Sequence, residues 1–244
     1  MLRGRLGADD SEAESSYCGL CRRPRDAVII AVVGGTGKLG AAIARKLAQA
    51  GRKVVIGSRT ADNAQRTANA LGHGVTGMAN AAAAARGDII FLTIPFAAQE
   101  ATLAEIAPHA VGKILIDTTV PLMPPKVMRV QLPAEGSAAV RAQRLLGAQV
   151  TVVSGFHNVA AHKLAAEKDI GCDALVFSDD KAARAIVIEL ANQMGLRGLH
   201  GGALANSAAA EAMTSVLIFI NKTYGVDGAG IQITGQLTEP TGPN

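Results

Sequence analysis

The residues with the clearest chemistry are three glycines with the spacing Gly35-x-Gly37-x-x-Gly40. An apolar run at residues 27–33 precedes them, and a helical pattern at residues 41–50 follows them. In a strand-turn-helix unit this spacing is typical of a dinucleotide site, although a purely structural turn is the alternative. We expect Gly35 to permit the tight turn, Gly37 to let the backbone approach a pyrophosphate, and Gly40 to let the helix pack on the strand. Amides at the start of the helix then face the phosphates.

The end of the next apolar run indicates which dinucleotide binds. An NAD site usually has Asp or Glu there, which accepts hydrogen bonds from the ribose hydroxyls and repels a 2′-phosphate. This chain has Gly57, Ser58, Arg59 and Thr60 instead. Because a guanidinium with hydroxyl neighbours suits a phosphate, the sequence predicts NADP(H) as the cofactor. The alternative is that Arg59 is only a solvated loop cation.

The composition agrees with an α/β protein that handles small anionic molecules. The chain has 244 residues, of which 49% are hydrophobic, with 27 Gly and no Trp. Small and branched side chains allow the close contacts between helices and sheet that α/β folds require. The net charge of +4 comes without an arginine-rich face or interleaved aromatic residues, so we expect no nucleic-acid partner.

Strand and helix patterns alternate from residue 27 onward. After the run that ends at Ser58, a short strand with its turns lies at residues 72–80, further strand patterns lie at residues 88–94, 113–117, 149–154, 174–178 and 196–200, and helical patterns lie at residues 61–71, 79–86, 99–106, 137–146 and 181–194. Strands that are apolar on both faces are parallel and covered by helices. We therefore predict an α/β fold, a doubly wound parallel-sheet Rossmann domain at residues 27–201, with a small C-terminal helical region at residues 202–238.

Ligands of such a sheet bind beyond the carboxyl ends of its strands. Residues 93–96 and 118–121 follow two of these ends, so we expect both segments to line the cofactor cleft; ordinary strand caps are the alternative. Residues 121–133 contain four prolines and should form a loop near this cleft. His157 and Asn158 follow the strand at residues 149–154, where a substrate would lie, although a lone histidine is more often structural.

The two ends of the chain differ from this pattern. Residues 1–26 are polar and aperiodic, which indicates a disordered leader without the apolar core of a secretory signal. Cys18 and Cys21 form a C-x-x-C pair, but Cys172 is the only other cysteine. We therefore expect no metal site and a location in the reducing cytoplasm. Residues 239–244 form a polar tail.

One helical pattern, at residues 211–222, is apolar around most of its circumference. It is shorter than the ~20 residues that a membrane span needs, so we expect a buried helix and no membrane partner. The helix could pack on its own domain or on a partner subunit, which would make a homodimer. Residues 228–237 after it have a short strand-like pattern.

Seven segments, in their order and spacing, resemble the NADPH-dependent coenzyme F420 reductases, also called F420:NADP oxidoreductases. They read GGTGKLG, VIGSRT, LTIPF, DTTVP, VSGFHNVAA, ALANSAAAEAMTSVLI and AGIQITG, across residues 28–235. The resemblance implies reversible hydride transfer between nicotinamide C4 of NADP(H) and deazaflavin C5 of coenzyme F420. The two rings would stack between the sheet and the C-terminal region. Such a transfer needs alignment more than an acid or a nucleophile.

The resemblance also implies which residues form the site. No residue would act as acid or base, and His157 would line the ring-stacking site. The cofactor-binding residues would be Gly35, Thr36, Gly37, Lys38, Leu39, Gly40, Ser58, Arg59, Thr93, Ile94, Pro95, Val120, His157, Asn158, Val159, Asn206, Ser207, Gly230 and Ile231. Two positions depart from the family pattern: residues 61–63 carry no basic side chain, and Gln232 stands where many relatives have Arg or Lys.

Two other functions fit the same fold. The first is an NADP-dependent reductase of a small hydroxy acid, imine or ketol acid, for which Lys163 and Glu167 would be the candidate proton donors or polarising groups. The second is a non-catalytic NADP sensor that reports redox state to a partner.

Overall fold

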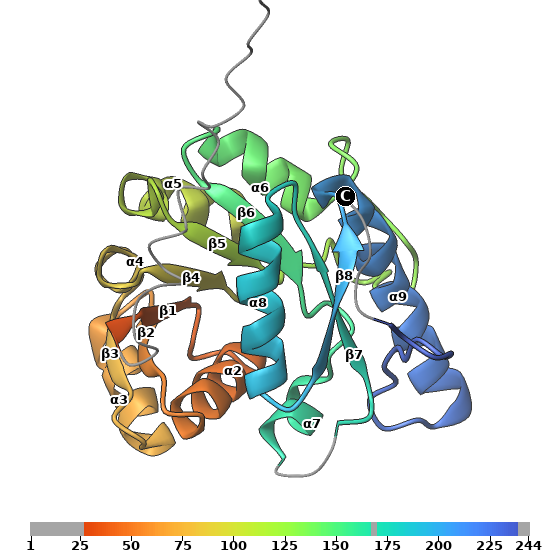
Figure 1. Cartoon of the computed structure of the whole chain (residues 1–244), viewed down its shortest axis with the longest axis horizontal. Helices are drawn as coiled ribbons and strands as arrows, with labels where there is room; N and C mark the ends of the chain where they lie inside the picture. Colours follow the sequence, from red (N-terminus) through yellow and green to blue (C-terminus); the bar gives the residue numbers. More distant parts are fainter. Residues whose placement is uncertain (1–26, 167–169, 239–244) are drawn as a thin grey trace, which may run out of the picture.

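The computed structural model describes residues 27–166 and 170–238. The predicted leader, with Cys18 and Cys21, and the predicted tail lie outside the described residues. The described chain forms one eight-stranded sheet with the strand order β3-β2-β1-β4-β5-β6-β7-β8 (Figure 1). The strands are β1 (Ile29–Val33), β2 (Lys53–Ser58), β3 (Thr76–Ala79), β4 (Ile89–Leu92), β5 (Ile114–Asp117), β6 (Thr151–Gly155), β7 (Asp173–Phe177) and β8 (Arg197–Gly202). The predicted Rossmann-type α/β class is confirmed.

Helices cover both faces of the sheet. Their bounds are α2 (Lys38–Gln49), α3 (Ala61–Leu71), α4 (Asn80–Arg86), η2 (Phe96–Ala98), α5 (Gln99–Ala110), α6 (Ala138–Leu146), α7 (Ala161–Ala165), α8 (Lys181–Gln193), η3 (Leu204–Asn206) and α9 (Ser207–Tyr224). The first core lies between one face and α2, α3, α7 and α8, and the second lies between the other face and α4, α5 and α6. In Figure 1, α8 crosses in front of the sheet.

The central strands form because their sequences suit burial on both faces. β4 and β5 consist almost entirely of large apolar side chains, and each is buried along its whole length. Both pair in parallel with their neighbours, so the carboxyl ends of β1, β2, β4, β5 and β6 share one edge of the sheet. This edge is where a ligand of an open α/β sheet binds.

The last two strands reverse the direction of the sheet. β7 runs antiparallel to β6, through the register pairs Ser154 with Phe177 and Gly155 with Val176, and β8 runs parallel to β7. The prediction that the whole sheet is parallel was therefore wrong for these two strands. As a consequence, β7 and β8 begin at the edge where β6 ends, which is the ligand edge.

The segment after α9 is extended but forms no strand. The strand expected within residues 228–237 is absent from the described part of the chain, which has no helix or strand at residues 225–238. The segment lies beside the start of β7 instead, where the Ile231 carbonyl accepts a hydrogen bond from the Asp173 amide at 2.7 Å. A single backbone bond of this kind does not make a ladder.

Helix α9 is longer than the pattern at residues 211–222 suggested. By length and composition alone, the stretch Leu204–Tyr224 is long and apolar enough to cross a membrane, so the expected shortness of the helix was wrong. Of its apolar 18-residue window, 33% is buried in the fold. Glu211 and Ser215 face inward, whereas Met213 and Phe219 are exposed. One side of α9 is therefore a core helix, and the other is open.

A buried carboxyl group attaches α9 to α6. Glu211 is 1% exposed, and its oxygens accept hydrogen bonds from the amides of Ala138 at 2.6 Å and Ala139 at 3.2 Å. These amides begin α6 and lack partners within the helix, so the carboxyl oxygens of Glu211 satisfy them. Burial raises the pKa of Glu211 to about 8. Burial also raises the pKa of Asp117, the neighbouring carboxyl at the end of β5, to about 6.

We expect Glu211→Gln to flatten the pH dependence of stability. The folded protein keeps the Glu211 proton up to about pH 8, whereas the unfolded chain loses it near the ordinary value of 4.5. The free energy of unfolding of the unmodified protein should therefore fall, relative to the variant, as the pH rises between these values. Thermal melts followed by circular dichroism at about pH 5 and about pH 8 measure the difference. An equal change in melting temperature between the two pH values in both proteins would contradict the raised pKa of Glu211.

Candidate active site

The turn after β1 is built by glycines that approach other strands closely. Gly34 has a φ of +77°, and its amide donates to Oδ1 of the buried Asn80 at 3.4 Å. A Cβ on Gly35 would lie 2.7 Å from Cβ of Ile56 in β2. The residue that permits the tight turn is therefore Gly34 rather than Gly35. Gly35 is required by its contact with β2.

The start of α2 has the features of a phosphate site. A Cβ on Gly40 would lie 2.5 Å from Oγ1 of Thr93, so this glycine lets α2 pack against the end of β4, as predicted. A Cβ on Gly37 would have no protein atom nearer than 3.4 Å, which leaves room above the turn. Among the described residues, no side chain caps α2 and its first turn carries no acid. Its free amides therefore fit a phosphate.

The end of β2 presents hydroxyl groups and a cation. Oγ of Ser58 lies 3.5 Å from Oγ1 of Thr36 and accepts a hydrogen bond from Nδ2 of Asn63 at 3.3 Å. Arg59 and Lys38 are exposed beside them in the chain. Asn63, at a position where the sequence departs from the family pattern, therefore orients Ser58. These side chains fit the 2′-phosphate of NADP(H) better than the free ribose hydroxyls of NAD(H), because none of them is a carboxylate that could accept from those hydroxyls.

The ends of β4 and β5 continue the same edge. Oγ1 of Thr93 donates to the Val33 carbonyl at 2.9 Å, which holds the end of β4 against the glycine turn. Ile94 and Val120 are half-buried, and Pro95 is exposed. A depression of about 290 Å³ adjoins these segments and is lined by Phe96, Ala97, Glu100, Leu122, Met123, Pro124 and Arg141. Phe96, of the first segment expected to line the cleft, lines this depression, and Leu122 directly follows the second segment.

The exit from β6 carries the predicted histidine in a constrained turn. Phe156 has a φ of +67°, which is unusual for a bulky residue, and its buried ring packs 5.7 Å from that of Phe91. Nε2 of His157 lies 3.1 Å from Oγ of Ser154, and Nδ1 is buried without a partner among the described residues. Burial lowers the pKa of His157 to about 4. The imidazole is therefore neutral at pH 7.

The C-terminal segment meets this exit. Nδ2 of Asn158 donates to the Asp173 carbonyl at 2.9 Å, while its Oδ1 is buried without a partner among the described residues. A Cβ on Gly230 would lie 2.5 Å from Cβ of Cys172 and 3.7 Å from the Asn158 carbonyl oxygen. Val159 is buried and Ile231 half-buried alongside. The structure thus brings together residues that are about seventy positions apart in the sequence.

Asn206 and Ser207 lie just before and at the start of α9, and Ser207 contacts the start of α6, past the carboxyl end of β5. Nδ2 of Asn206 donates to the Gly201 carbonyl at 3.1 Å, at the end of β8, which the strand register places level with Ser154 of β6. The Ser207 hydroxyl is fully buried and donates to Oγ of Ser137 at 2.9 Å. The α9 residue beside His157 is Thr214, whose hydroxyl donates to the His157 carbonyl at 3.0 Å. Sequence reasoning missed Thr214 because nothing in its helix distinguishes it from a packing residue.

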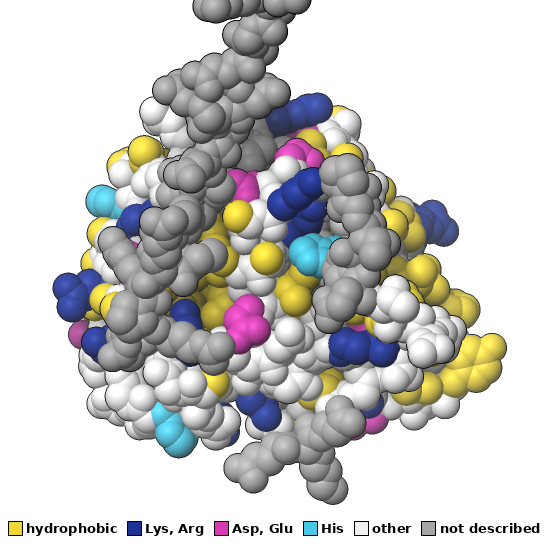
Figure 2. All heavy atoms as spheres, in the orientation of Figure 1, with side chains coloured by type: hydrophobic (Ala, Val, Ile, Leu, Met, Phe, Trp, Pro, Cys, Tyr) yellow, Lys and Arg dark blue, Asp and Glu magenta, His cyan; other side chains and the backbone are white. Residues whose placement is uncertain are grey.

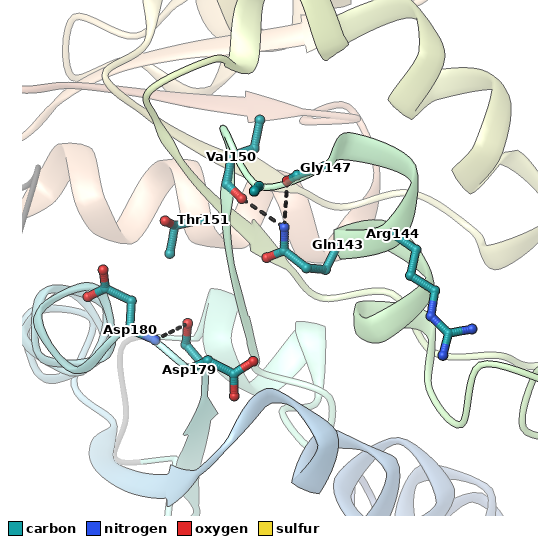
Figure 3. Close-up of a pocket in the computed structure, with 9 residues that line it drawn as sticks. Gln143, Arg144, Gly147, Val150, Thr151, Asp179 and Asp180 are labelled. Carbon is teal, nitrogen blue, oxygen red and sulfur yellow. Dashed lines mark hydrogen bonds between the residues drawn. The ribbon is translucent and has the colours of Figure 1, made fainter.

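A second depression, of about 530 Å³, lies between the end of α6 and the turn from β7 to α8 (Figure 3). Several of its polar side chains bond to the backbone of the fold. Gln143 bonds the backbone of Gly147, Val150 and Val152. Asp179 accepts from the Leu204 amide. Because these groups serve the backbone, the depression is a gap between elements and not part of the site.

Together these features define the class of protein: a Rossmann-type oxidoreductase with an NADP-type site at the carboxyl edge of the sheet. The family model "NADP oxidoreductase coenzyme F420-dependent" matches residues 29–121. The chain is 39% identical to the F420-dependent NADP reductase of Methanothermobacter thermautotrophicus, over 84% of this chain and 94% of that protein. It is 35% identical to that of Methanocaldococcus jannaschii, over 84% and 97%. The chain belongs to the F420-dependent NADP reductase family.

Similarity to solved structures supports the fold alone. A hypothetical protein from Sinorhizobium meliloti superposes with a TM-score of 0.63 at 20% sequence identity. The match covers 74% of this chain and 87% of that one.

We expect Gly37→Ala to separate nucleotide binding from stability. φ at Gly37 is −75°, which alanine adopts readily, and the added methyl group has room within the protein. The melting temperature should change by less than about 2 °C. A methyl group where the pyrophosphate approaches should weaken NADPH binding about tenfold or more, as measured by fluorescence titration.

Gly40→Ala is the matched comparison, because its methyl group would collide with Thr93 and with Cα of Gly35. This variant should lose both stability and binding. Unchanged NADPH affinity in Gly37→Ala would place the phosphates somewhere else.

Proposed function

We propose that this chain catalyses reversible hydride transfer between NADP(H) and coenzyme F420. The observation that carries the proposal is the 39% identity to an F420-dependent NADP reductase over 94% of that protein's length. The arrangement of the site supports it, because the glycine turn, Ser58 with Arg59, and His157 follow the ends of β1, β2 and β6 at one edge of the sheet.

NADP(H) would be bound at the ends of the first strands. The amides after Gly37 would bind the pyrophosphate. Thr36, Ser58 and Arg59 would bind the 2′-phosphate through hydroxyl and guanidinium groups. The remaining contacts on this side would come from Lys38, Leu39, Thr93, Ile94, Pro95 and Val120.

The rings would meet at the exit from β6. His157, Asn158 and Val159 would form one wall, and Gly230 and Ile231 the other. When bound, the two ring systems supply the chemistry: a hydride moves between nicotinamide C4 and deazaflavin C5, and one proton is exchanged with solvent. Because burial keeps His157 neutral, its role is to shape the cleft and align the rings, which is what such a transfer requires.

Reduction of a small imine or hydroxy acid is less well supported. Such a reaction requires a polarising acid or a proton donor close to the nicotinamide. Lys163 lies half-buried on α7, and its proposed companion Glu167 lies outside the described residues. The neutral His157 would not serve as the donor.

We further propose that the protein is a cytoplasmic homodimer that pairs through the open side of α9. Figure 2 shows hydrophobic side chains gathered over the region where α9 and the following segment lie in Figure 1. Met213, Phe219 and Tyr224 are exposed to 39%, 53% and 75%. Light scattering after size exclusion should give the mass of two chains for the unmodified protein and of one chain for Phe219→Glu. A single-chain mass for both would contradict the dimer.

Purified protein should bleach the visible absorption of oxidised F420 when NADPH is added, and far more slowly with NADH. Arg59→Gln should raise the KM for NADPH about tenfold or more and leave the reaction with NADH unchanged, because only the 2′-phosphate is affected.

Arg66→Gln is the matched control, since Arg66 is an exposed cation on the neighbouring α3. It should leave both KM values within about twofold. NADPH binding without bleaching would contradict the F420 assignment, and equal effects of the two variants would contradict the role of Arg59.

A further inference from the structure

We propose that Asp173 and Arg197 form a positioning latch that holds the C-terminal segment against the ring site and thereby sets the affinity for the deazaflavin partner. The proposal rests on the proposed function, in which Gly230 and Ile231 form one wall of that site. Asp173 and Arg197 begin β7 and β8 and lie opposite each other in the parallel register.

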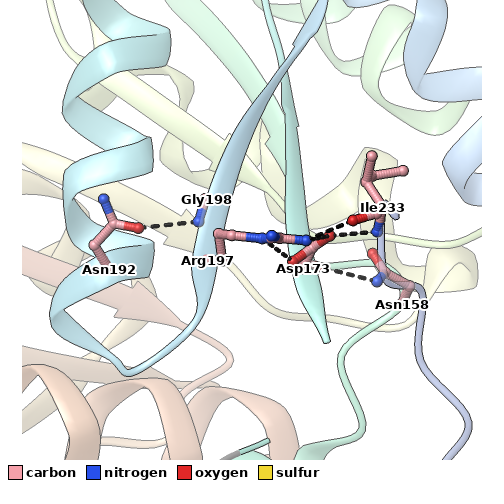
Figure 4. A network of polar contacts seen from close by, with 6 residues as sticks. All are labelled: Asn158, Asp173, Asn192, Arg197, Gly198 and Ile233. Carbon is pink, nitrogen blue, oxygen red and sulfur yellow. Dashed lines mark hydrogen bonds and ion pairs between the residues drawn. The ribbon is translucent and has the colours of Figure 1, made fainter. Parts of the chain in front are cut away.

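Arg197 and Asp173 form a bidentate ion pair. Nε of Arg197 donates to Oδ1 of Asp173 at 2.7 Å, and Nη2 donates to Oδ2 at 2.8 Å (Figure 4). Asp173 is 2% exposed, whereas Arg197 is exposed to solvent. The hydrogen bonds from Arg197 hold the pKa of Asp173 below its ordinary value, so the carboxylate is charged at neutral pH. A planar guanidinium makes both bonds at once, which an ammonium group does not.

The same two side chains bind the backbone of the C-terminal segment. The Ile233 amide donates to Oδ2 of Asp173 at 2.6 Å, and Nη2 of Arg197 donates to the Ile233 carbonyl at 2.8 Å. The Asp173 amide donates to the Ile231 carbonyl at 2.7 Å. These three bonds replace the strand ladder that the segment does not form, so its position depends on this pair.

Asp173 also connects the segment to the exit from β6. Its carbonyl accepts the hydrogen bond from Asn158, next to His157, while its side chain holds Ile233. One residue therefore fixes both walls of the proposed ring site. An isolated exposed ion pair contributes little to the free energy of unfolding. The main effect of this pair is therefore to orient the backbone groups that it binds.

The first readout is structural and independent of any reaction. In Arg197→Gln and in the nearly isosteric Asp173→Asn, amide hydrogen exchange of Ile233, followed by NMR, should be about tenfold faster or more. Asp227→Asn is the matched control, because it breaks an exposed ion pair between the same segment and His162. It should leave the Ile233 amide unchanged. Unchanged exchange in both latch variants would overturn the latch.

The second readout is kinetic. Both latch variants should raise the KM for F420 about tenfold, with kcat at saturating F420 and the KM for NADPH changed less than about twofold. Arg197→Lys should show the defect of Arg197→Gln, because it lacks the planar fork. Equal losses for NADPH and F420, or faster exchange without any change in the KM for F420, would overturn the positioning role. Failure of the unmodified protein to reduce F420 would overturn the proposed function instead, and the exchange measurement would still report on the latch.

Discussion

The site depends on one close approach between backbone and side chain at the end of β1. The glycines of this turn have neighbours so near that a Cβ would fall 2.7 Å from Ile56 or 2.5 Å from Thr93. Because these glycines have no side chain, α2 can start directly above the ends of β1 and β4. The free amides of α2 therefore face the edge of the sheet where the other strand ends gather. Bulkier residues would move the helix and, with it, the phosphate site.

The reversal at β7 completes the site on the other side. A uniformly parallel sheet would begin β7 and β8 at the far edge and leave the C-terminal segment there. Because β7 is antiparallel to β6, its first residue, Asp173, lies near the β6 exit and meets both Asn158 and Ile233. The proposed nucleotide side of the cleft is thus made by helix packing, and the proposed ring side by a polar contact that crosses between distant segments. These two halves have different physical origins.

Local pattern predicted most of the elements, and α3 has the bounds that its sequence indicated. The direction of β7 was not predictable, because an apolar strand suits either orientation. The alternating pattern after Gly230 suggested a strand, but too few partners are available there. The role of Gly34 in the turn was not predicted, because a sequence motif gives the spacing of glycines and not which of them has a positive φ. Asp173 and Arg197 were missed because charges separated by 24 positions acquire a relation only through the strand register.

The central claim is direct transfer between two bound rings without a protein group that carries the hydrogen. Reaction of oxidised F420 with NADPH deuterated at both C4 positions, in ordinary water, tests it most directly. Direct transfer should place one deuterium in the reduced F420, detected by mass spectrometry. Reduced F420 without deuterium would mean that hydrogen passes through solvent or a side chain, which excludes direct transfer.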